Sequence, residues 1–379
     1  MSIPTGTNFE SLSRQSTAIL EVFAAAGFER IAPAILQPAD VYLEAIGEDL
    51  RARSFVFADP DGNELCLRPD LTVPACRYYL SLHPAASEPA RYAYHGPIFR
   101  YQPRGETPTH PREFRQAGIE LINMPDREQA EADCLALTVR SLKAAGLREH
   151  RLRLGDLGLF HAALAAIDMP ERWRTRLAQD FWRPERFHRR LRQIAGEAAG
   201  QVNPHLIATE LALEQHLENG GIQHVGIRNL AEIAAHLAER QADAEARPLP
   251  MPTLDLIENL LAISGRPVDA IAVIERLTVK AGITIGPAIA SFRRRLALLE
   301  AAGINTSTAV FAAEFGRNIA YYTGFVFQVE VPELGVDEPV AGGGRYDRLF
   351  GQIGAPREVP AVGAAIHTER LIAVAGVSA

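Results

Sequence analysis

The stretch YAYHGPIFRYQPRGETPTHPREFRQAGIE, residues 92–120, is the part of the chain from which the rest can be interpreted. Aromatic and β-branched residues over 92–101 predict a strand. A segment rich in proline, glycine and threonine follows over 102–111 and predicts a loop. A second strand is expected over 112–122, so the stretch predicts an antiparallel hairpin.

The second strand of this hairpin presents an unusual row of side chains. Side chains alternate between the two faces of a strand, so Phe114, Gln116, Gly118 and Glu120 share one face. Arg100 ends the first strand and can face the same row. An aromatic ring, an amide and a carboxylate suggest the floor of a site for a ligand that is flat at one end and cationic at the other. An amphipathic hairpin with one solvent-exposed face would show the same alternation.

These residues also carry a resemblance to a known family. FRYQP (99–103), REFRQ (112–116) and GIE (118–120) resemble motif 2 of class II aminoacyl-tRNA synthetases, in the form found in histidyl-tRNA synthetases. FERIAPAIL (28–36) resembles motif 1, and VPAVGAAIHTERL (359–371) resembles motif 3. The resemblance implies an α+β fold, an antiparallel sheet flanked by helices, and a dimer formed through the motif 1 region.

A segment before the hairpin adds to this resemblance. LRPDLTVP (67–74) is similar to a segment of histidyl-tRNA synthetases that offers an acid and a hydroxyl to the amino group of histidine. Asp70 and Thr72 take those two places here. A simpler alternative is a strand-to-helix turn in which Asp70 caps the following helix, and both interpretations can hold together.

Two segments near the end of the chain resemble parts peculiar to histidyl-tRNA synthetases. Arg317 precedes the pair Tyr321 and Tyr322, and GGGRYD follows at 342–347. The family implies that the arginine is the catalytic cation and that the tyrosines line the imidazole pocket. Glycines allow backbone to approach a ligand closely, although a glycine-rich turn would need the same residues.

The chain departs from a synthetase on the nucleotide side. Gln102 stands where motif 2 has an acid, and His367 stands where motif 3 has a glycine that leaves room for the nucleotide. Phe114, His367 and Arg370 are therefore interpreted as a vestigial nucleotide side. Few residues follow Leu371, so no anticodon-binding domain is expected.

The residues expected to bind histidine offer acceptors for an ammonium, a donor for a carboxylate and aromatic walls for an imidazole. They are Asp70, Thr72, Arg100, Gln116, Glu120, Arg317, Tyr321 and Tyr322. This pattern suits a protein that binds histidine without activating it, and it resembles the family of ATP phosphoribosyltransferase regulatory subunits. That family implies a non-catalytic partner of a short catalytic subunit, in a hetero-octamer that activates the first step of histidine biosynthesis and mediates its feedback inhibition by histidine.

Two other functions remain open at this stage. A compact synthetase-like enzyme that activates histidine or a related amino acid with ATP would also use Arg100, Arg317 and Arg370. A tRNA-binding module without catalysis would rest on the basic run RPERFHRRLR at 183–192. A solvated helix face or a contact with an acidic partner explains that run more simply.

Composition narrows the class of protein. The 379 residues carry a formal net charge of −7, which gives no general attraction to nucleic acid. No signal peptide and no bilayer-spanning run is recognised, and three scattered cysteines without zinc spacing indicate the reducing cytoplasm. No cofactor and no metal are expected.

The pattern also predicts how the chain is divided. Residues 1–170 and 276–379 are expected to form the synthetase-like core. Between them, 171–275 is rich in alanine, leucine, glutamate and arginine and predicts a helical insertion, interrupted by PLPMP at 248–252.

Overall fold

The computed structural model divides the chain into two compact units, Met1–Ile167 with Asn259–Ala379 and Asp168–Glu258. It describes residues 6–45, 52–103, 105–107, 110–196, 230–316 and 321–375. The sequence pattern placed the second boundary of the insertion at 275. The contacts place it earlier because Ser264 pairs with Ala312 and so joins the large sheet of the first unit.

A nine-stranded sheet forms the centre of the first unit, in the order β1-β5-β6-β12-β11-β10-β7-β9-β8. Its strands are β1 (Glu29–Arg30), β5 (Ala90–Phe99), β6 (Glu113–Ile122), β7 (Arg151–Asp156), β8 (Ser264–Gly265), β9 (Val310–Ala312), β10 (Phe325–Glu330), β11 (Ala341–Arg345) and β12 (Ala361–His367). The pairs β1–β5 and β7–β9 are parallel and the others are antiparallel. The expected α+β fold with a sheet flanked by helices is confirmed, and the sheet is mixed because two of its strand pairs are parallel.

The hairpin predicted from residues 92–122 is present as β5 and β6. Its register runs from Ala90 opposite Ile122 to Phe99 opposite Glu113. On its other side β6 pairs with β12, where Glu120 lies opposite Gly363. The three motifs recognised in the sequence therefore meet on adjacent strands, because β1 borders β5 and β12 borders β6.

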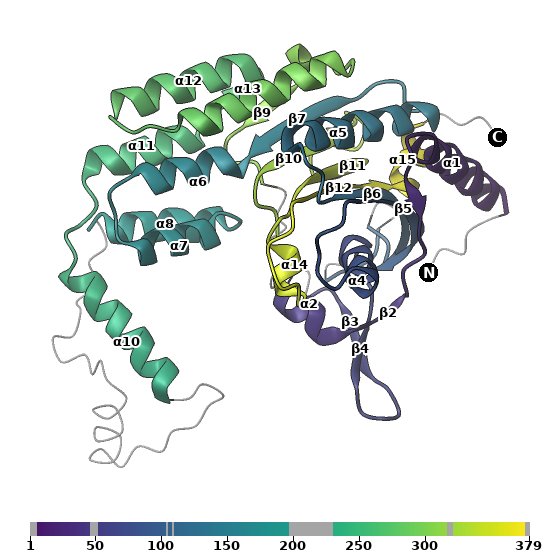
Figure 1. The fold of residues 1–379 in the computed structure, drawn as a ribbon, viewed down its shortest axis with the longest axis horizontal. Coiled ribbons are helices and arrows are strands. Elements are labelled where there is room, and N and C mark those ends of the chain that lie inside the picture. Colours follow the sequence, from purple (N-terminus) through teal and green to yellow (C-terminus); the bar gives the residue numbers. More distant parts are fainter. Residues whose placement is uncertain are drawn as a thin grey trace. The chain divides into compact units, whose positions relative to one another are not determined.

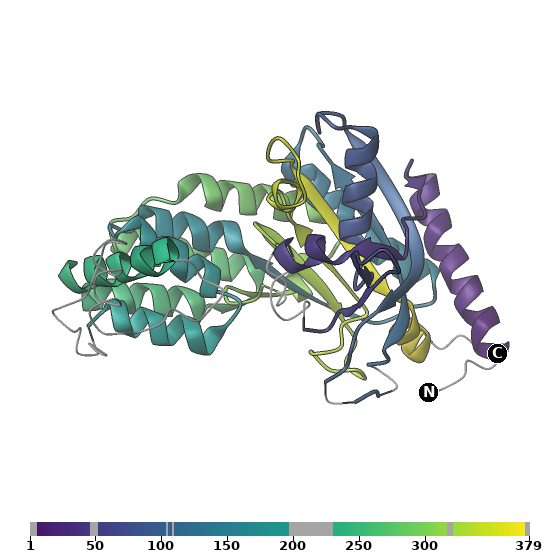
Figure 2. The same cartoon turned by 90° about the horizontal axis from the view of Figure 1, so that it is seen from below.

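Helices pack on this sheet and at its ends. Those of the first unit are α1 (Gly6–Ala25), α2 (Ala39–Ala45), α4 (Thr72–Leu82), α5 (Arg127–Ala144), α6 (Leu157–Ala166), α12 (Pro267–Lys280), α13 (Gly286–Ala301), α14 (Leu349–Gln352) and α15 (Thr368–Val374), with a 3₁₀ turn at Thr306–Thr308. Helix α5 lies along one face of the sheet and contacts β6, β10, β11 and β12 (Figure 1). Helix α1 lies beside α15 and also packs on β5 and β6 (Figure 2).

Local chemistry explains where these elements begin. The Asp126 side chain accepts a hydrogen bond from Gln129 N and so caps the start of α5. The Gln129 side chain does not return to the cap and instead donates to Asp133 Oδ1 at 2.8 Å. Only one of the two hydrogen bonds of a capping box is therefore formed at the start of α5.

A small three-stranded sheet precedes the segment that carries Asp70, which follows directly after its strand β4. Its order is β2-β4-β3, with β2 at Leu36–Pro38, β3 at Phe55–Ala58 and β4 at Glu64–Leu67. In the β3–β4 turn the Asp59 carboxylate accepts from Asp61 N and Asn63 N, and Gly62 adopts a left-handed φ of 85°.

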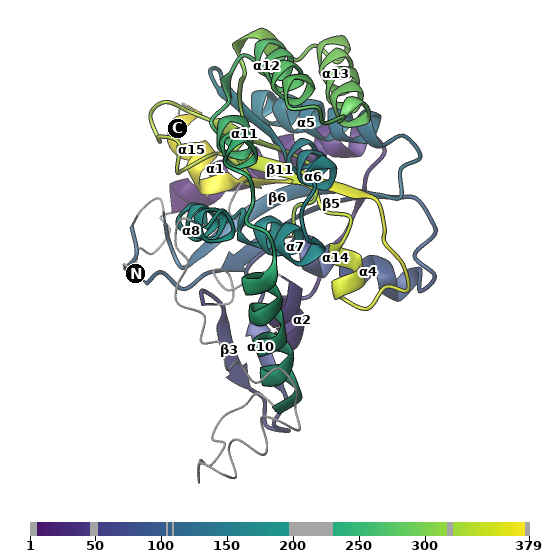
Figure 3. The same ribbon diagram turned by 90° about the vertical axis from the view of Figure 1, so that its left-hand side faces the viewer.

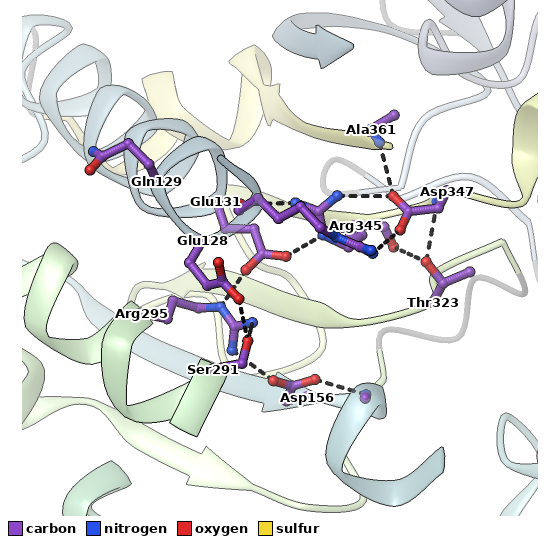
Figure 4. A network of polar contacts seen from close by, with 12 residues as sticks. Glu128, Gln129, Glu131, Asp156, Ser291, Arg295, Thr323, Arg345, Asp347 and Ala361 are labelled. Carbon is purple, nitrogen blue, oxygen red and sulfur yellow. Dashed lines mark hydrogen bonds and ion pairs between the residues drawn. The ribbon is translucent and has the colours of Figure 1, made fainter. Parts of the chain in front are cut away.

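A buried ion network joins the helices to the strands, and Glu131 on α5 lies at its centre (Figure 4). One Glu131 oxygen accepts from Arg295 of α13 and the other from Arg345 of β11. Burial alone would raise the pKa of Glu131, but the charges of the two arginines hold it below its usual value. Arg295 also donates to Asp156 Oδ2 at 2.6 Å, so the network reaches the end of β7.

The second unit is helical. It contains α7 (Glu171–Asp180), α8 (Pro184–Ile194), α10 (Leu230–Glu245) and the first part of α11 (Met251–Leu261). Helices α7 and α8 pack side by side (Figure 3). Arg186 and Arg190 of the basic run pair with the buried Asp180. The charges of these two arginines are therefore paired within the unit. Residues 197–229 lie outside the described residues.

Replacing Glu131 by Gln should destabilise the protein strongly, because Arg295 and Arg345 would then lie together in a buried site without the carboxylate that pairs with both of them, each keeping one aspartate partner. We expect a loss of about 3–5 kcal/mol in the free energy of unfolding. Urea unfolding of Glu131→Gln measures it, with Glu275→Gln as the control because the Glu275–Arg293 pair is exposed. The control should lose less than about 1 kcal/mol. Equal losses in both variants would contradict a structural role of the network.

Candidate functional site

The strands β6, β11 and β12 line one cavity together with the segments that precede α4 and β10. Its walls carry residues from every segment in which the sequence resembles a synthetase motif, apart from motif 1. They are Asp70, Thr72, Arg100, Gln116, Tyr321, Tyr322, Pro339, Val340, Ala341, Gly342, Tyr346, Gly363, Ala364, Ala365, His367 and Arg370. Residues that are far apart in the chain therefore meet because their strands are neighbours in the sheet.

Asp70 brings a buried carboxylate to this cavity. Its Oδ1 accepts from Val73 N at 3.1 Å, which holds the first turn of α4. Its Oδ2 is buried and has no hydrogen-bond partner among the described residues. Burial raises the pKa of Asp70 to about 6, although the Val73 N–H and the charges of Arg100 and Arg68 pull it down. The side chain therefore supports the helix with one oxygen and presents the other as an unused acceptor.

Gln116 adds a second unused acceptor to the same cavity. Its Oε1 is buried and, like Asp70 Oδ2, lacks a hydrogen-bond partner within the described chain. Gln116 projects from β6, where it lies opposite Gly96 on β5 and His367 on β12. A buried acceptor without a donor costs about 1–3 kcal/mol, so two of them in one cavity indicate a site that receives a hydrogen-bond donor.

Glu120 lies beneath the cavity and is fully buried. Its two oxygens accept hydrogen bonds from the hydroxyls of Tyr94 and Tyr346. Burial raises the pKa of Glu120 to about 7, whereas these hydroxyls and that of Thr72 lower it. Gly363 leaves the room that this arrangement needs, since a Cβ there would lie 1.6 Å from Glu120 Oε2.

Tyr321 and Tyr322 form the aromatic side of the cavity. Their rings are 5.0 Å apart, and Tyr321 also contacts the Tyr346 ring edge-on at 5.8 Å. The segment is fixed just after them, because Thr323 N donates to Arg345 O at 2.8 Å. Arg317, expected to act as a cation here, lies outside the described residues.

The residues interpreted as a nucleotide side form a closed stack. The rings of Phe114 and His367 are parallel within 6° and 4.2 Å apart. The Arg100 guanidinium lies 5.5 Å from the centre of the Phe114 ring. Phe114 is consequently only 4% exposed. Arg370 lines the cavity nearby and donates to Pro339 O at 3.2 Å.

Gln102, which stands in place of the motif 2 acid, has a structural task. Its amide donates to Pro111 O at 3.0 Å, and its Oε1 accepts from Arg53 Nη2 at 2.6 Å. It therefore ties the two ends of the 102–111 segment together. The glycines of GGGRYD are also used internally, since a Cβ at Gly343 would lie 2.2 Å from Gly363 O. Of these three glycines, Gly342 is the one that lines the cavity.

Sequence reasoning missed the two tyrosines that hold Glu120. Tyr346 belongs to the quoted GGGRYD segment, and Tyr94 belongs to the predicted hairpin. Tyr94 lies opposite Gly118, where a Cβ would lie 2.6 Å from the tyrosine ring. The strand register that shows this pairing comes only from the structure.

The described part of the chain lacks two further features. No group of three or more histidine, cysteine, aspartate or glutamate side chains is placed to hold a metal ion. None of its helices has the length and hydropathy needed to cross a bilayer.

Comparison with known proteins agrees with the sheet and the motifs. A family model described as histidyl-tRNA synthetase matches residues 7–200 and 198–371. The ATP phosphoribosyltransferase regulatory subunit of Mesorhizobium japonicum is 36% identical over 372 residues, covering 94% of this chain and 96% of that protein. The protein of the same description from Agrobacterium fabrum is 35% identical over 377 residues, with 94% and 96% covered.

Solved structures share the fold. A Bacillus halodurans protein described as an ATP phosphoribosyltransferase regulatory subunit/histidyl-tRNA synthetase has a TM-score of 0.70 at 24% identity, covering 99% of this chain and 82% of the other. A histidyl-tRNA synthetase from a Nostoc species has a TM-score of 0.62 at 17% identity, covering 98% and 74%.

Replacing Glu120 by Gln should change how stability depends on pH. Burial raises the folded-state pKa of Glu120 to about 7, above its ordinary value of 4.5, so the stability that it contributes is present below pH 4.5 and is lost as pH rises through 7. Relative to Glu120→Gln, the wild type should therefore lose about 3 kcal/mol between pH 4.5 and 8. Urea unfolding at several pH values measures this, with the exposed Glu64→Gln as the control. A constant difference between wild type and Glu120→Gln would refute the raised pKa.

Proposed function

Since this chain belongs to the histidyl-tRNA synthetase family, among relatives described as ATP phosphoribosyltransferase regulatory subunits, we propose that it senses free histidine for such a transferase. Its relatives support a role in histidine biosynthesis. In this proposal the chain binds histidine, carries no catalytic step, and both activates and feedback-inhibits a short-form catalytic subunit in a hetero-octamer.

The observation that carries this proposal is the pair of unused buried acceptors, Asp70 Oδ2 and Gln116 Oε1, in one cavity. An ammonium is a compact group with several donors and can satisfy both oxygens at once. Thr72 adds a hydroxyl beside them. The amino group of histidine supplies such an ammonium, and Asp70 supplies the opposite charge.

The remaining walls suit the other two parts of histidine. Arg100 keeps its charge at neutral pH, because burial lowers its pKa only to about 10. Its guanidinium can face the carboxylate of the ligand, with Arg317 as a further candidate cation outside the described residues. Tyr321 and Tyr322 provide a hydroxyl-bearing aromatic wall for the imidazole. Glu120 serves from below by holding Tyr346 at the cavity floor.

The closed stack on the nucleotide side favours binding without activation. A nucleobase needs an open aromatic face to stack upon. His367 covers one face of Phe114, and Arg100 approaches the ring as well. Gln102 replaces the motif 2 acid with a neutral amide. Both ends of this amide are already hydrogen-bonded within the protein, to Arg53 and to Pro111. These contacts support a receptor more than an adenylate-forming enzyme.

Self-association through the motif 1 region is part of the proposal. A groove lies between α1 and β5, lined by Leu12, Leu20, Phe28 and Ala93 among others. Phe9 on α1 is 61% exposed and also lines the groove. Apolar surface of this kind is typical of a protein interface, which supports a second copy as its occupant.

Histidine should bind the purified protein, and Asp70→Asn should weaken that binding. The amide keeps the shape of the carboxylate but removes the charge that pairs with the ammonium. We expect a loss of about 2–4 kcal/mol in binding free energy by titration calorimetry. Asp61→Asn, in the exposed β3–β4 turn, is the matched control and should bind as wild type. Unchanged affinity in Asp70→Asn would remove this carboxylate from the site.

The purified protein should not catalyse histidine-dependent exchange between ATP and pyrophosphate, because Phe114 cannot receive the nucleobase while His367 lies on it. A histidyl-tRNA synthetase assayed in parallel provides the positive control. Robust exchange by the wild-type protein would favour the alternative of a compact amino-acid-activating enzyme.

Histidine should inhibit the transferase complex through this chain. The test is a steady-state assay of the short-form catalytic subunit reconstituted with wild type, Asp70→Asn or Asp61→Asn. A coupling of about 1–3 kcal/mol between sites gives strong feedback, and it requires that histidine prefer one state of the complex. Wild-type and Asp61→Asn complexes should respond alike, and the Asp70→Asn complex should need far more histidine. Equal inhibition of all three would place the regulatory site elsewhere.

A further inference from the structure

One buried carboxylate beside the cavity is held by neutral hydroxyls. Glu120 is fully buried, and its oxygens accept hydrogen bonds from the hydroxyls of Tyr94 and Tyr346. Within the described residues neither oxygen is paired with a cation. Tyr346 lines the cavity, whereas Tyr94 is not among the described residues that line it. At Tyr346, one hydrogen bond therefore separates the Glu120 carboxylate from the cavity wall.

The protons of this cluster can be counted for each state of the carboxyl group. Burial raises the pKa of both tyrosine hydroxyls well above their ordinary value, so each hydroxyl keeps its proton at neutral pH. An ionised Glu120 only accepts hydrogen bonds, so both tyrosines can donate to it and the Tyr346 oxygen keeps a lone pair free. A protonated Glu120 has a proton of its own to donate, so one hydroxyl must turn its proton elsewhere.

We propose that ligand binding in the cavity is coupled to the loss of a proton from Glu120, with Tyr346 as the connecting group. The unused atoms of the cavity, Asp70 Oδ2 and Gln116 Oε1, are both acceptors, so the cavity suits a ligand that brings donors. With Glu120 ionised, the Tyr346 oxygen is a further acceptor. With Glu120 protonated, a Tyr346 hydroxyl turned to the cavity opposes a donor, so the ligand selects the ionised state.

The position of Tyr346 agrees with this coupling. Its ring contacts the ring of Tyr321 edge-on, with 5.8 Å between the ring centres, at the aromatic side of the cavity. A ligand ring that lies against Tyr321 therefore comes close to Tyr346. That the ligand is histidine rests on the proposed function, whereas the response of the Tyr346 hydroxyl to the ionisation of Glu120 does not.

The surroundings of Glu120 place its change of charge near neutral pH. The groups that face it are Tyr94 on β5, Tyr346 after β11, Asp70 before α4, Thr72 and Cys76 on α4, and Cys134 on α5. None of them carries a positive charge, and burial raises the pKa of Glu120 to about 7. The thiol of Cys76 is a weak acceptor for a tyrosine proton. Asp70 titrates lower, because burial raises its pKa to about 6.

Titration calorimetry with histidine at pH 7, in buffers of different ionisation enthalpy, counts the protons that binding releases. Wild type should release about half a proton more than Glu120→Gln, because a group with a pKa of about 7 is half protonated at this pH. Between pH 6 and 8, histidine affinity should rise about tenfold more in wild type than in Glu120→Gln. Asp70 is present in both proteins, so its own ionisation cancels. Equal proton release by the two proteins would overturn the coupling.

Two tyrosine variants test whether Tyr346 is the connecting group. Tyr346→Phe and Tyr94→Phe each remove one hydroxyl that donates to Glu120, but Tyr346 is the one that lines the cavity. Tyr94→Phe should still release more protons than Glu120→Gln, and Tyr346→Phe should release no more than Glu120→Gln. Extra release that persists in Tyr346→Phe, or that is lost in Tyr94→Phe, would contradict this role of Tyr346.

A measurement without ligand separates this inference from the proposed function. The ¹³C signals of the Glu120 carboxyl and of Tyr346 Cζ are followed by NMR as pH changes, and each is identified by its loss in Glu120→Gln or Tyr346→Phe. In wild type both signals should titrate with one midpoint near pH 7, and the Tyr346 signal should stay constant in Glu120→Gln. A Tyr346 signal that does not follow Glu120 in wild type would overturn the inference. If wild type binds no histidine, the proposed function fails, and this titration still decides whether Tyr346 responds to Glu120.

Discussion

The buried carboxylate of Glu131 is the constraint on which the first unit depends. A single ionised group in a low-dielectric interior must be paired on both oxygens, and here the partners come from a helix and a strand that are remote in sequence. Arg345 links Glu131 to the segment after β11, because its Nη1 donates to Asp347 Oδ1 at 2.9 Å. Asp347 in turn accepts from Ala361 N and donates its own N–H to Thr323. One charge cluster therefore fixes α5, α13 and the strands around the cavity.

The cavity differs from this network in one physical respect. In the Glu131 network the carboxylate is paired with arginines, whereas in the cavity Asp70 Oδ2 and Gln116 Oε1 accept no hydrogen bond from the described residues. The same sheet therefore carries a paired ion cluster that holds its elements together and a cavity with acceptors open to a ligand. Glu120 stands between the two, since its oxygens are satisfied by tyrosine hydroxyls and not by charges. A neutral-donor environment leaves its pKa high, whereas Glu131 is held ionised.

The stack of Phe114 and His367 gives the proposed function a physical basis on the nucleotide side. His367 ends β12 and begins α15, so its ring is placed by the backbone that in the family forms motif 3. The His367 ring stacks on the Phe114 ring and so covers the face on which a nucleobase could stack. In the proposed function, this one ring at a strand end covers the aromatic face of Phe114, whereas the residues proposed to bind histidine come mostly from other segments.

The sequence alone determined the hairpin β5–β6 and several of the residues that line the cavity, because alternation and motif residues are local properties. Asp70, Thr72, Gln116, Tyr321 and Tyr322 were predicted to meet, and they do. Only the tertiary structure decided that Glu120 lies under the floor and that His367 covers Phe114. Each of these depends on strand register and on helices packed from distant parts of the chain. A pattern of residue types carries no such information, since it does not say which buried atom is left without a partner.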